Sequence, residues 1–205
     1  MSLRYQIIII HYHHYLHKNN VENTIYELIL GECKIQKAII PTEFENLSVI
    51  ASNVNLAAAE IELIGINQKE YILKRAVEKI EKNYDFIIID CPPGSACSVM
   101  ESIEDADYCL LVAEPTAFGF HNFCMVHELA GILGKPCGVV INKYEEVYEP
   151  LEEYCRKHEL PVLLRIPYEE EIASAVSKGM ILSEQSPEYK AKFQSLLSRI
   201  GGENL

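Results

Sequence analysis

The stretch FIIIDCPPG, residues Phe86–Gly94, decides the fold. Its run of apolar residues is typical of a strand that is buried on both faces. Asp90 ends this strand, and two prolines and a glycine form the turn that follows. In nucleotide-binding proteins an aspartate at such a position orients a water molecule on a magnesium ion. The alternative interpretation is an ordinary turn or helix-capping aspartate.

Apolar runs and helical patterns alternate along the rest of the chain. Continuous apolar strands with helices between them predict an α/β fold with a mostly parallel sheet, in a single domain over residues 1–205. The expected strands are Leu47–Ser52, Asp85–Asp90, Asp107–Glu114, Cys137–Lys143 and Pro161–Pro167. The expected helices are Gln68–Asn83, Val99–Ala106, Gly119–Leu133, Pro150–His158, Glu169–Lys178 and Pro187–Ile200.

Composition limits the classes of function. The 205 residues are 49% hydrophobic, enough for a sizeable core, and the net charge of −12 argues against nucleic-acid binding by overall electrostatics. No apolar run is long enough to span a membrane, and no secretory signal is present. The seven cysteines form no C-x-x-C pair. We therefore expect reduced thiols, a cytoplasmic location and no membrane attachment.

In an open parallel sheet, ligands bind at the carboxyl ends of the strands. Four such ends carry polar residues: Asp90, Glu114–Gly119, Asn142–Glu146 and the segment from Pro167 to Gly179. An asparagine such as Asn142 could offer paired donor and acceptor groups to a purine edge, although an ordinary turn asparagine explains it equally well.

Residues 85–119, DFIIIDCPPGSACSVMESIEDADYCLLVAEPTAFG, resemble the Walker B and switch II region of the ParA/MinD (Soj-like) family of deviant-Walker P-loop ATPases. KPCGVVINK (135–143) and RIPYEEEIASAVSKG (165–179) resemble later parts of the same family. Residues 19–63 are similar to the middle of Soj-type chromosome-partitioning ATPases. From Gly94 onward the chain is closer to the MinD-like branch that carries iron–sulfur clusters, but it lacks the cysteine-rich insertion, so we expect no cluster.

The resemblance implies a three-layer, doubly wound sheet of the P-loop NTPase type, ATP and Mg²⁺ as ligands, and a homodimer. It also assigns roles to single residues. Asp90 matches the catalytic Walker B aspartate, which contacts the magnesium ion through water. The other matched positions are Pro92, Pro93 and Gly94 at switch II, Asn142 at the adenine, and Pro167 and Tyr168 in the loop that closes over the adenine.

The start of the chain departs from this family. Members open with a strand and a Gly-rich Walker A loop, and a second strand then leads to switch I. The only Gly-Lys pair here, Gly134-Lys135, precedes a proline and a strand, and residues 1–17 form an atypical segment. Gln6–Ile10 could fill the slot of the first strand, but the next eight residues contain no glycine to shape a phosphate loop. Truncation, a frameshift and natural loss all remain open.

We therefore expect a ParA/MinD-like domain for chromosome or plasmid partitioning, cell-division positioning or cluster delivery, with impaired Mg-ATP binding and hydrolysis. The alternative is a non-catalytic interaction or regulatory module that uses the switch II and Glu114–Gly119 surfaces.

Replacing Asp90 by alanine tests its assignment to magnesium. The substitution should abolish any magnesium-dependent part of nucleotide binding, because the carboxylate that orients the metal-bound water is removed, and it should leave the fold intact. Titration calorimetry with and without Mg²⁺, beside a circular dichroism spectrum, checks both points. Retained magnesium dependence in the variant would remove Asp90 from the mechanism.

Overall fold

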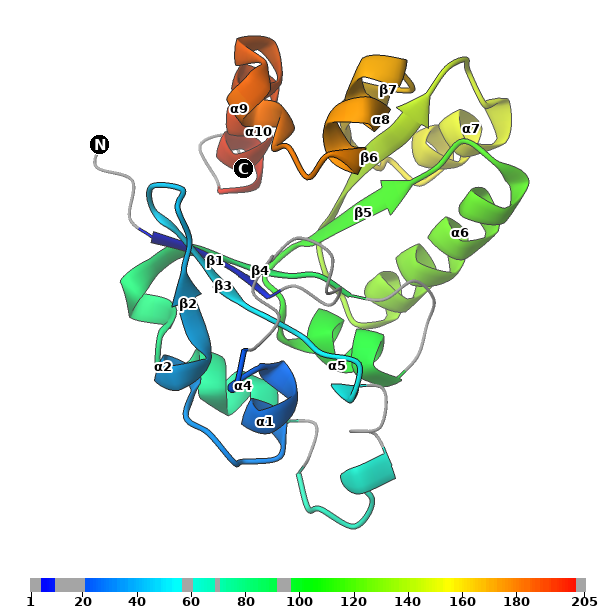
Figure 1. The fold of residues 1–205 in the computed structure, drawn as a ribbon. Coiled ribbons are helices and arrows are strands. Elements are labelled where there is room, and N and C mark those ends of the chain that lie inside the picture. Colours follow the sequence, from blue (N-terminus) through cyan, green and yellow to red (C-terminus); the bar gives the residue numbers. More distant parts are fainter. Residues whose placement is uncertain (1–4, 10–20, 57–60, 69–70, 92–96, 202–205) are drawn as a thin grey trace. The chain divides into compact units, whose positions relative to one another are not determined.

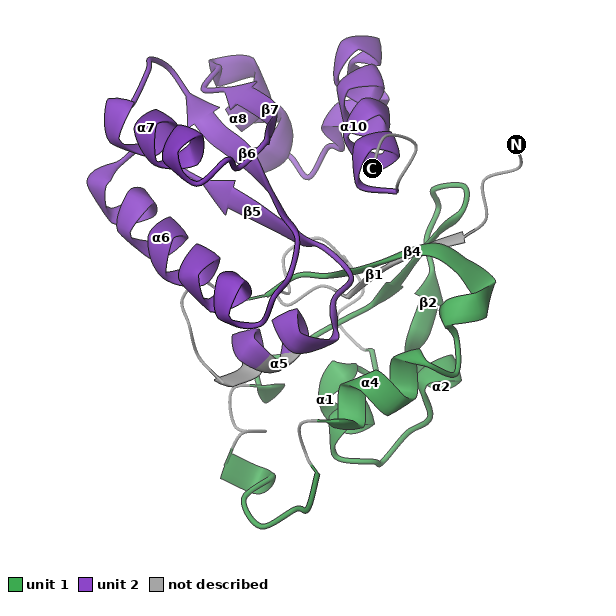
Figure 2. Ribbon diagram, turned by 180° about the vertical axis from the view of Figure 1, so that it is seen from behind, with its two compact units in different colours: residues 1–92 green, residues 93–205 purple. Residues whose placement is uncertain are grey.

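The computed structural model of the protein describes residues 5–9, 21–56, 61–68, 71–91 and 97–201 (Figure 1). The chain divides into two compact units, residues 1–92 and 93–205, which are described separately below (Figure 2). Strands and helices alternate in both units, and all but one of the strand pairs are parallel. This confirms the predicted α/β class with a mostly parallel sheet. The assignment of residues 1–205 to one domain stays a prediction.

The first unit holds a four-stranded sheet in the order β2-β3-β1-β4. β1 pairs in parallel with both β3 and β4, whereas the short β2 is antiparallel to β3. The strands are β1 (Tyr5–Ile9), β2 (Ile39–Pro41), β3 (Leu47–Ile50) and β4 (Tyr84–Ile89). The helices are α1 (Ile25–Ile29), α2 (Ile35–Ala38) and α4 (Ile72–Val77), with a 3₁₀ turn η3 (Glu81–Asn83) before β4.

Helices α1, α2 and α4 pack on this sheet through a shared apolar core. Seven of its members are buried and come from α1, α2, β3 and the α4 region: Ile25, Leu28, Ile35, Ala38, Ile50, Ala76 and Ile80. The predicted helix Gln68–Asn83 is therefore present in part, as α4 and η3, and three of its apolar residues, Leu73, Ala76 and Ile80, belong to the core.

A polar network starts α1 and ties it to the chain after β3. The Thr24 hydroxyl accepts a hydrogen bond from the N–H of Tyr26 at 3.2 Å, and the Glu27 carboxylate accepts one from the N–H of Thr24 at 2.7 Å. This reciprocal pair is a capping box. The Asn53 side-chain amide donates to the Thr24 hydroxyl at 3.0 Å and to the Glu27 carboxylate at 3.2 Å. Thr24 is buried, so the network satisfies polar groups that would otherwise be costly.

The second unit holds three parallel strands in the order β5-β6-β7. The strands are β5 (Cys109–Ala113), β6 (Cys137–Tyr144) and β7 (Val162–Pro167). The helices are α5 (Cys97–Asp105), α6 (Ala117–Ile132), α7 (Glu149–Lys157), α8 (Glu170–Ser177), α9 (Leu182–Gln185) and α10 (Pro187–Ile200). Each strand and helix predicted for this half is present within two residues of its expected ends.

Burial differs between these strands. The central strand β6 is buried at four consecutive positions, Gly138–Ile141, as expected for a strand covered on both faces. The expectation of double burial is wrong for β5, because Leu110 is 38% and Val112 62% exposed while Cys109, Leu111 and Ala113 are buried. The reason lies in the sheet order, since β5 is an edge strand of its sheet in the described part of the chain.

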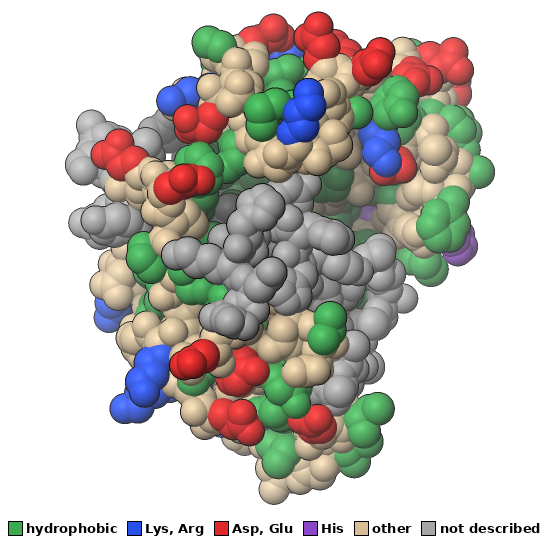
Figure 3. Space-filling view, in the orientation of Figure 1, with side chains coloured by type: hydrophobic (Ala, Val, Ile, Leu, Met, Phe, Trp, Pro, Cys, Tyr) green, Lys and Arg blue, Asp and Glu red, His purple; other side chains and the backbone are tan. Residues whose placement is uncertain are grey.

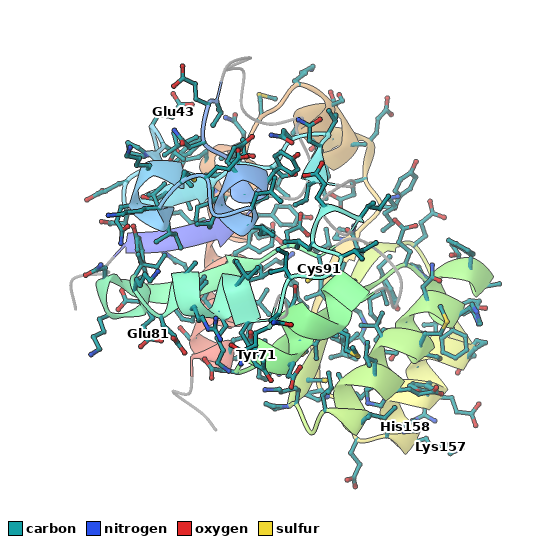
Figure 4. All side chains as sticks on the ribbon, turned by 90° about the horizontal axis from the view of Figure 1, so that it is seen from below. Glu43, Tyr71, Glu81, Cys91, Lys157 and His158 are labelled. Carbon is teal, nitrogen blue, oxygen red and sulfur yellow. The ribbon has the colours of Figure 1, made fainter. Side chains whose placement is uncertain are left out.

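An aromatic cluster joins α6 to α7. The Tyr154 ring stacks on His158 at 4.2 Å between centroids and meets the edge of Phe123 at 5.8 Å. His127 Nδ1 lies 3.0 Å from the Tyr154 hydroxyl. Burial lowers the pKa of His127, and the neighbouring His158 lowers it further. Figure 4 shows His158 beside Lys157 at the end of α7. The cluster stabilises the helix pair that flanks the loop described below.

The last helix, α10, has the bounds that the sequence predicts. Tyr189 and Leu196 are buried, and the Arg199 guanidinium donates to the Leu163 carbonyl of β7 at 2.9 Å. In Figure 3 acidic side chains gather over the part of the second unit where Figure 1 shows β7 and α8. No helix within the described residues is both long and apolar enough to cross a membrane.

Changing Glu27 to glutamine should destabilise the protein in a pH-dependent way. Burial raises the pKa of Glu27, but hydrogen bonds from Thr24 and Asn53 outweigh it and bring the pKa below its usual range. A depressed pKa means that the carboxylate stabilises the fold above about pH 4.3, and that this contribution is lost as the pH falls through the folded-state value. We expect a loss of about 1 kcal/mol at pH 7, because the side chain is partly exposed.

Urea unfolding at pH 7 and at pH 3.5 measures this difference. Glu43→Gln is the control, since Glu43 is an exposed carboxylate in the β2–β3 turn (Figure 4), and it should leave stability unchanged at both pH values. An equal loss for Glu27→Gln at both pH values would contradict the role of the charged form.

Candidate functional site

Three strand ends of the second unit meet at one edge of its sheet. Ala113, the last residue of β5, pairs with Ile141 of β6, and Tyr144, the last residue of β6, pairs with Pro167 at the end of β7. The chain then leaves each strand on the same side, which is the edge where parallel sheets bind ligands. The loops that follow these strands begin at Glu114, Glu145 and Tyr168.

These loops enclose a pocket of about 340 Å³. The pocket is partly open, and its walls combine apolar and aromatic side chains with four charged ones. The lining residues are Glu114, Pro115, Thr116, Lys143, Glu145, Glu146, Val147, Tyr148 and Tyr168.

The first wall is held by the start of α6. The Thr116 N–H donates to the Glu114 carbonyl at 2.8 Å, and the Thr116 hydroxyl accepts from the Gly119 N–H at 3.0 Å as the N-cap of the helix. Gly119 lies close to this turn, because a Cβ atom at its position would come within 2.5 Å of the Glu114 carbonyl oxygen. The glycine therefore allows the loop to fold back against the helix.

The second wall carries the one cation among the lining residues. Lys143 Nζ lies 2.6 Å from a Glu114 carboxylate oxygen and so bridges the ends of β6 and β5. Both side chains are about half exposed, at 54% and 43%, so this ion pair contributes less than about 1 kcal/mol to stability. Lys143 has a φ of 54°, a left-handed conformation that directs the chain into the acidic loop at Glu145. Breaking this ion pair so that Lys143 can bind a ligand therefore costs little free energy.

The third wall is Tyr168, a residue that is 56% exposed. Its N–H donates to the Tyr144 carbonyl at 3.1 Å, which fastens the start of this loop to β6. Arg165 lies over the Tyr144 ring at 5.8 Å and makes a bidentate contact with Glu152 at 2.8 and 2.9 Å. The backbone under Tyr168 is therefore anchored, while its ring offers a flat apolar face to the pocket.

The charges of the lining point to a particular ligand class. Three carboxylates, Glu114, Glu145 and Glu146, face one ammonium, that of Lys143. This excess of negative charge disfavours a triphosphate inside the pocket. Aromatic and apolar walls with carboxylate acceptors instead suit a planar, hydrogen-bonding ring such as a nucleobase.

The predicted site residues fall in different places. Tyr168 lines the pocket, and Pro167 is the last residue of β7 directly before it. Asn142 is half-buried within β6 and is not among the lining residues, whereas its neighbour Lys143 is. Sequence reasoning named Lys143 only as part of a strand end, and it missed Tyr148.

Asp90 belongs to the first unit, where it is exposed directly after β4. Pro92, Pro93 and Gly94 lie outside the described residues. The roles assigned to all seven predicted residues stay predictions. Within the described residues no group of three or more His, Cys, Asp or Glu side chains is placed to hold a metal ion.

β1 is the first strand of the chain, and in the resembling family the phosphate loop directly follows the first strand. β1 lies inside its sheet between β3 and β4, as its apolar sequence suggests, while residues 10–20 lie outside the described part. At the edges of the two sheets, β4 pairs only with β1 and β5 only with β6 among the described residues. Both edge strands carry exposed apolar side chains, Ile88 at 40% and Val112 at 62%. Edges of this kind are normally paired or covered in a finished sheet.

Comparison with known proteins adds a family. The model of the AAA_31 family, described as an AAA domain, matches residues 11–130. The sporulation initiation inhibitor protein Soj of Bacillus subtilis is 38% identical over 92 residues, which are 45% of this chain and 36% of that protein. The chromosome partitioning protein ParA of Myxococcus xanthus is 35% identical over 94 residues, 46% of this chain and 33% of that protein. The matched stretches span about a third of the length of these curated relatives.

Solved structures share the fold over nearly the whole chain. The cell division ATPase MinD of Pyrococcus furiosus superimposes with a TM-score of 0.76 at 22% identity, covering 96% of this chain and 85% of that chain. An ATP complex of a McdA variant from Cyanothece gives a TM-score of 0.80 at 20% identity, covering 100% and 87%. At these identities the likeness shows the fold, which is that of ParA/MinD P-loop proteins.

Two glycines of α6 give a matched test of the first pocket wall. Gly119→Ala should destabilise the protein by about 1–3 kcal/mol, because the new Cβ atom meets the backbone of the Glu114 loop. Gly131→Ala meets no heavy atom within 4 Å and should instead stabilise the helix by up to about 1 kcal/mol. Urea unfolding of both variants measures the contrast. Equal changes in the free energy of unfolding for the two variants would show that the Glu114 loop does not require a glycine at position 119.

Proposed function

Because this chain belongs to the AAA_31 family of AAA domains, and within it to the ParA/MinD group, we propose that it is a nucleotide-binding domain whose second unit holds the base of ATP. The base occupies the pocket at the ends of β5, β6 and β7, beside the Tyr168 ring and near Lys143. From its relatives we propose a role in chromosome or plasmid partitioning, cell-division positioning or cluster delivery. We propose that the active form is a homodimer.

One observation carries the proposal. The pocket lies at the ends of three parallel strands, and its lining contains the exposed Tyr168 together with carboxylate side chains. A base stacked on Tyr168 would gain roughly 1–3 kcal/mol from that contact alone. The one exocyclic amino group of adenine can donate to the carboxylates of the lining, and adenine itself carries no charge to oppose them.

The same pocket is a poor phosphate site. Its negative charge repels a polyphosphate, and a cradle of consecutive N–H groups needs a Gly-rich loop that the sequence does not contain. We therefore propose that Mg²⁺ contributes little to binding, that Asp90 and the switch II residues Pro92, Pro93 and Gly94 serve the metal and phosphate half, and that hydrolysis by this chain is impaired. Asn142, Pro167 and Tyr168 belong to the base half.

Titration calorimetry with adenosine, AMP and ATP tests this proposal. We expect adenosine and AMP to bind at least as tightly as ATP, with dissociation constants on the order of 1 mM and no requirement for Mg²⁺. Tyr168→Ala should weaken adenosine binding about fivefold through the lost stacking surface. Tyr71→Ala, which removes a partly exposed tyrosine from the first unit (Figure 4), is the matched control and should bind like the parent.

A double change of Glu145 and Glu146 to glutamine separates charge from shape. It should tighten ATP binding more than adenosine binding, because only ATP carries the negative charge that these carboxylates oppose. Failure of adenosine to bind at 20 mM would refute the base pocket. ATP binding that is far tighter than adenosine binding and depends on Mg²⁺ would refute the proposed lack of phosphate contacts.

A second candidate, a non-catalytic interaction module, has one observation in its favour. Phe118, in the Glu114–Gly119 segment, is 76% exposed at the start of α6, and Val147, which lines the pocket, is 53% exposed. Exposed apolar side chains of this kind are frequent in protein interfaces. Absence of nucleotide binding together with loss of partner capture in Phe118→Ser would favour this candidate.

A further inference from the structure

Two cysteines begin neighbouring strands of the second unit. Cys109 is the first residue of β5, Cys137 is the first residue of β6, and the two are paired in register. Residues in register on adjacent parallel strands point to the same side of the sheet, so the two thiols lie on one face. The Cys109 N–H donates to the Pro136 carbonyl at 2.9 Å, which holds the two strand starts together.

The register places the two thiols next to each other. A hydrogen bond from the Cys137 thiol lowers the pKa of Cys109 to about 7, against the effect of burial, and the Lys135 ammonium lowers it further. The same contact raises the pKa of Cys137, which holds the shared proton. The single Cys137 hydrogen has a second acceptor, the Lys135 carbonyl at 3.4 Å, and can point to either group. A lowered pKa favours the thiolate form of Cys109, which is the form that reacts with oxidants.

Three other described thiols, Cys33, Cys124 and Cys155, do not share these properties. Burial raises the pKa of Cys155 to about 11, and burial also raises the pKa values of Cys33 and Cys124. Cys109 is only 8% exposed, but Cys137 is half-buried and opens the pair to a small oxidant. The two sulfurs therefore combine a reactive thiolate with an accessible resolving thiol.

The backbone geometry is compatible with a bond between them. Adjacent strands lie about 4.8 Å apart, so the two Cα atoms fall within the range that disulfides span. The Cβ atoms would have to approach by about 1 Å, which the first residues of two strands can accommodate more easily than strand centres. A bond formed under such strain is easily reduced, as regulatory disulfides are.

We propose that Cys109 and Cys137 form a reversible disulfide when the protein meets a peroxide. The Cys109 thiolate attacks one oxygen of hydrogen peroxide, the O–O bond breaks, and the departing hydroxide leaves as water with the proton of the former thiol. Cys137 sulfur then attacks the Cys109 sulfenic acid, the S–S bond forms, and the S–O bond breaks with loss of a second water. The two sulfurs give up two electrons to the peroxide, and a dithiol returns them.

Thiol titration of the full chain tests this site. After equimolar hydrogen peroxide the count of free thiols should fall from seven by two, and dithiothreitol should restore it. Peptide mapping with fragmentation should place the new link between Cys109 and Cys137. Cys124→Ser, which removes a thiol of α6 outside the pair, should still lose two thiols.

Cys109→Ser and Cys137→Ser should each abolish the link. Should either substitution prevent folding, the peptide map of the parent protein decides by itself. An unchanged thiol count, a loss of thiols without an S–S link, or a link that joins another pair of cysteines would each overturn the proposal.

Discussion

The site depends on the parallel pairing of β5, β6 and β7. Backbone hydrogen bonds align Ala113 with Ile141 and Tyr144 with Pro167, so three chain segments turn away from the sheet at the same edge. The centre of β6 is buried on both faces and holds this strand in the middle of the three-stranded sheet. This alignment is what brings the carboxylates, Lys143 and Tyr168 into one pocket.

Charge then decides which part of a nucleotide the pocket suits. Glu114 already neutralises Lys143 in part, and Glu145 and Glu146 leave the lining negative. A neutral ring fits these surroundings and a polyphosphate does not. Asp90, which the resemblance assigns to the metal, belongs to the other compact unit, and Pro92, Pro93 and Gly94 lie outside the described residues. The pocket of the second unit, taken by itself, therefore suits a neutral base better than a polyphosphate.

Much of the second unit could be predicted because its elements are long and strongly patterned. The apolar run at the start of β6 and the cap and proline at Ser186-Pro187 before α10 are local signals that the tertiary structure does not override. β5 has an equally apolar sequence, but its burial depends on its place at a sheet edge, which no local pattern contains. The short α1, α2 and β2 have too few residues for periodicity to detect, although the Thr24–Glu27 capping box was a readable signal for α1.

The pocket was predictable only in outline. Strand ends indicated the right loops, and the family resemblance indicated Tyr168. The Lys143–Glu114 contact was not predictable. It joins the end of β6 to the loop after β5 through Lys143, whose left-handed backbone conformation has no signal in the sequence. The same limit applies to Asn142 and Lys143, since neighbouring strand residues point to opposite sides and the choice depends on register.

The most direct test of the proposed base pocket is a map of amide chemical shifts on adding adenosine without phosphate or Mg²⁺. The account predicts saturable shifts at the pocket loops, at Glu114, Thr116, Lys143, Glu145 and Tyr168, and none around Asp90. Shifts confined to the first unit, or no saturable shift at any residue, would contradict it.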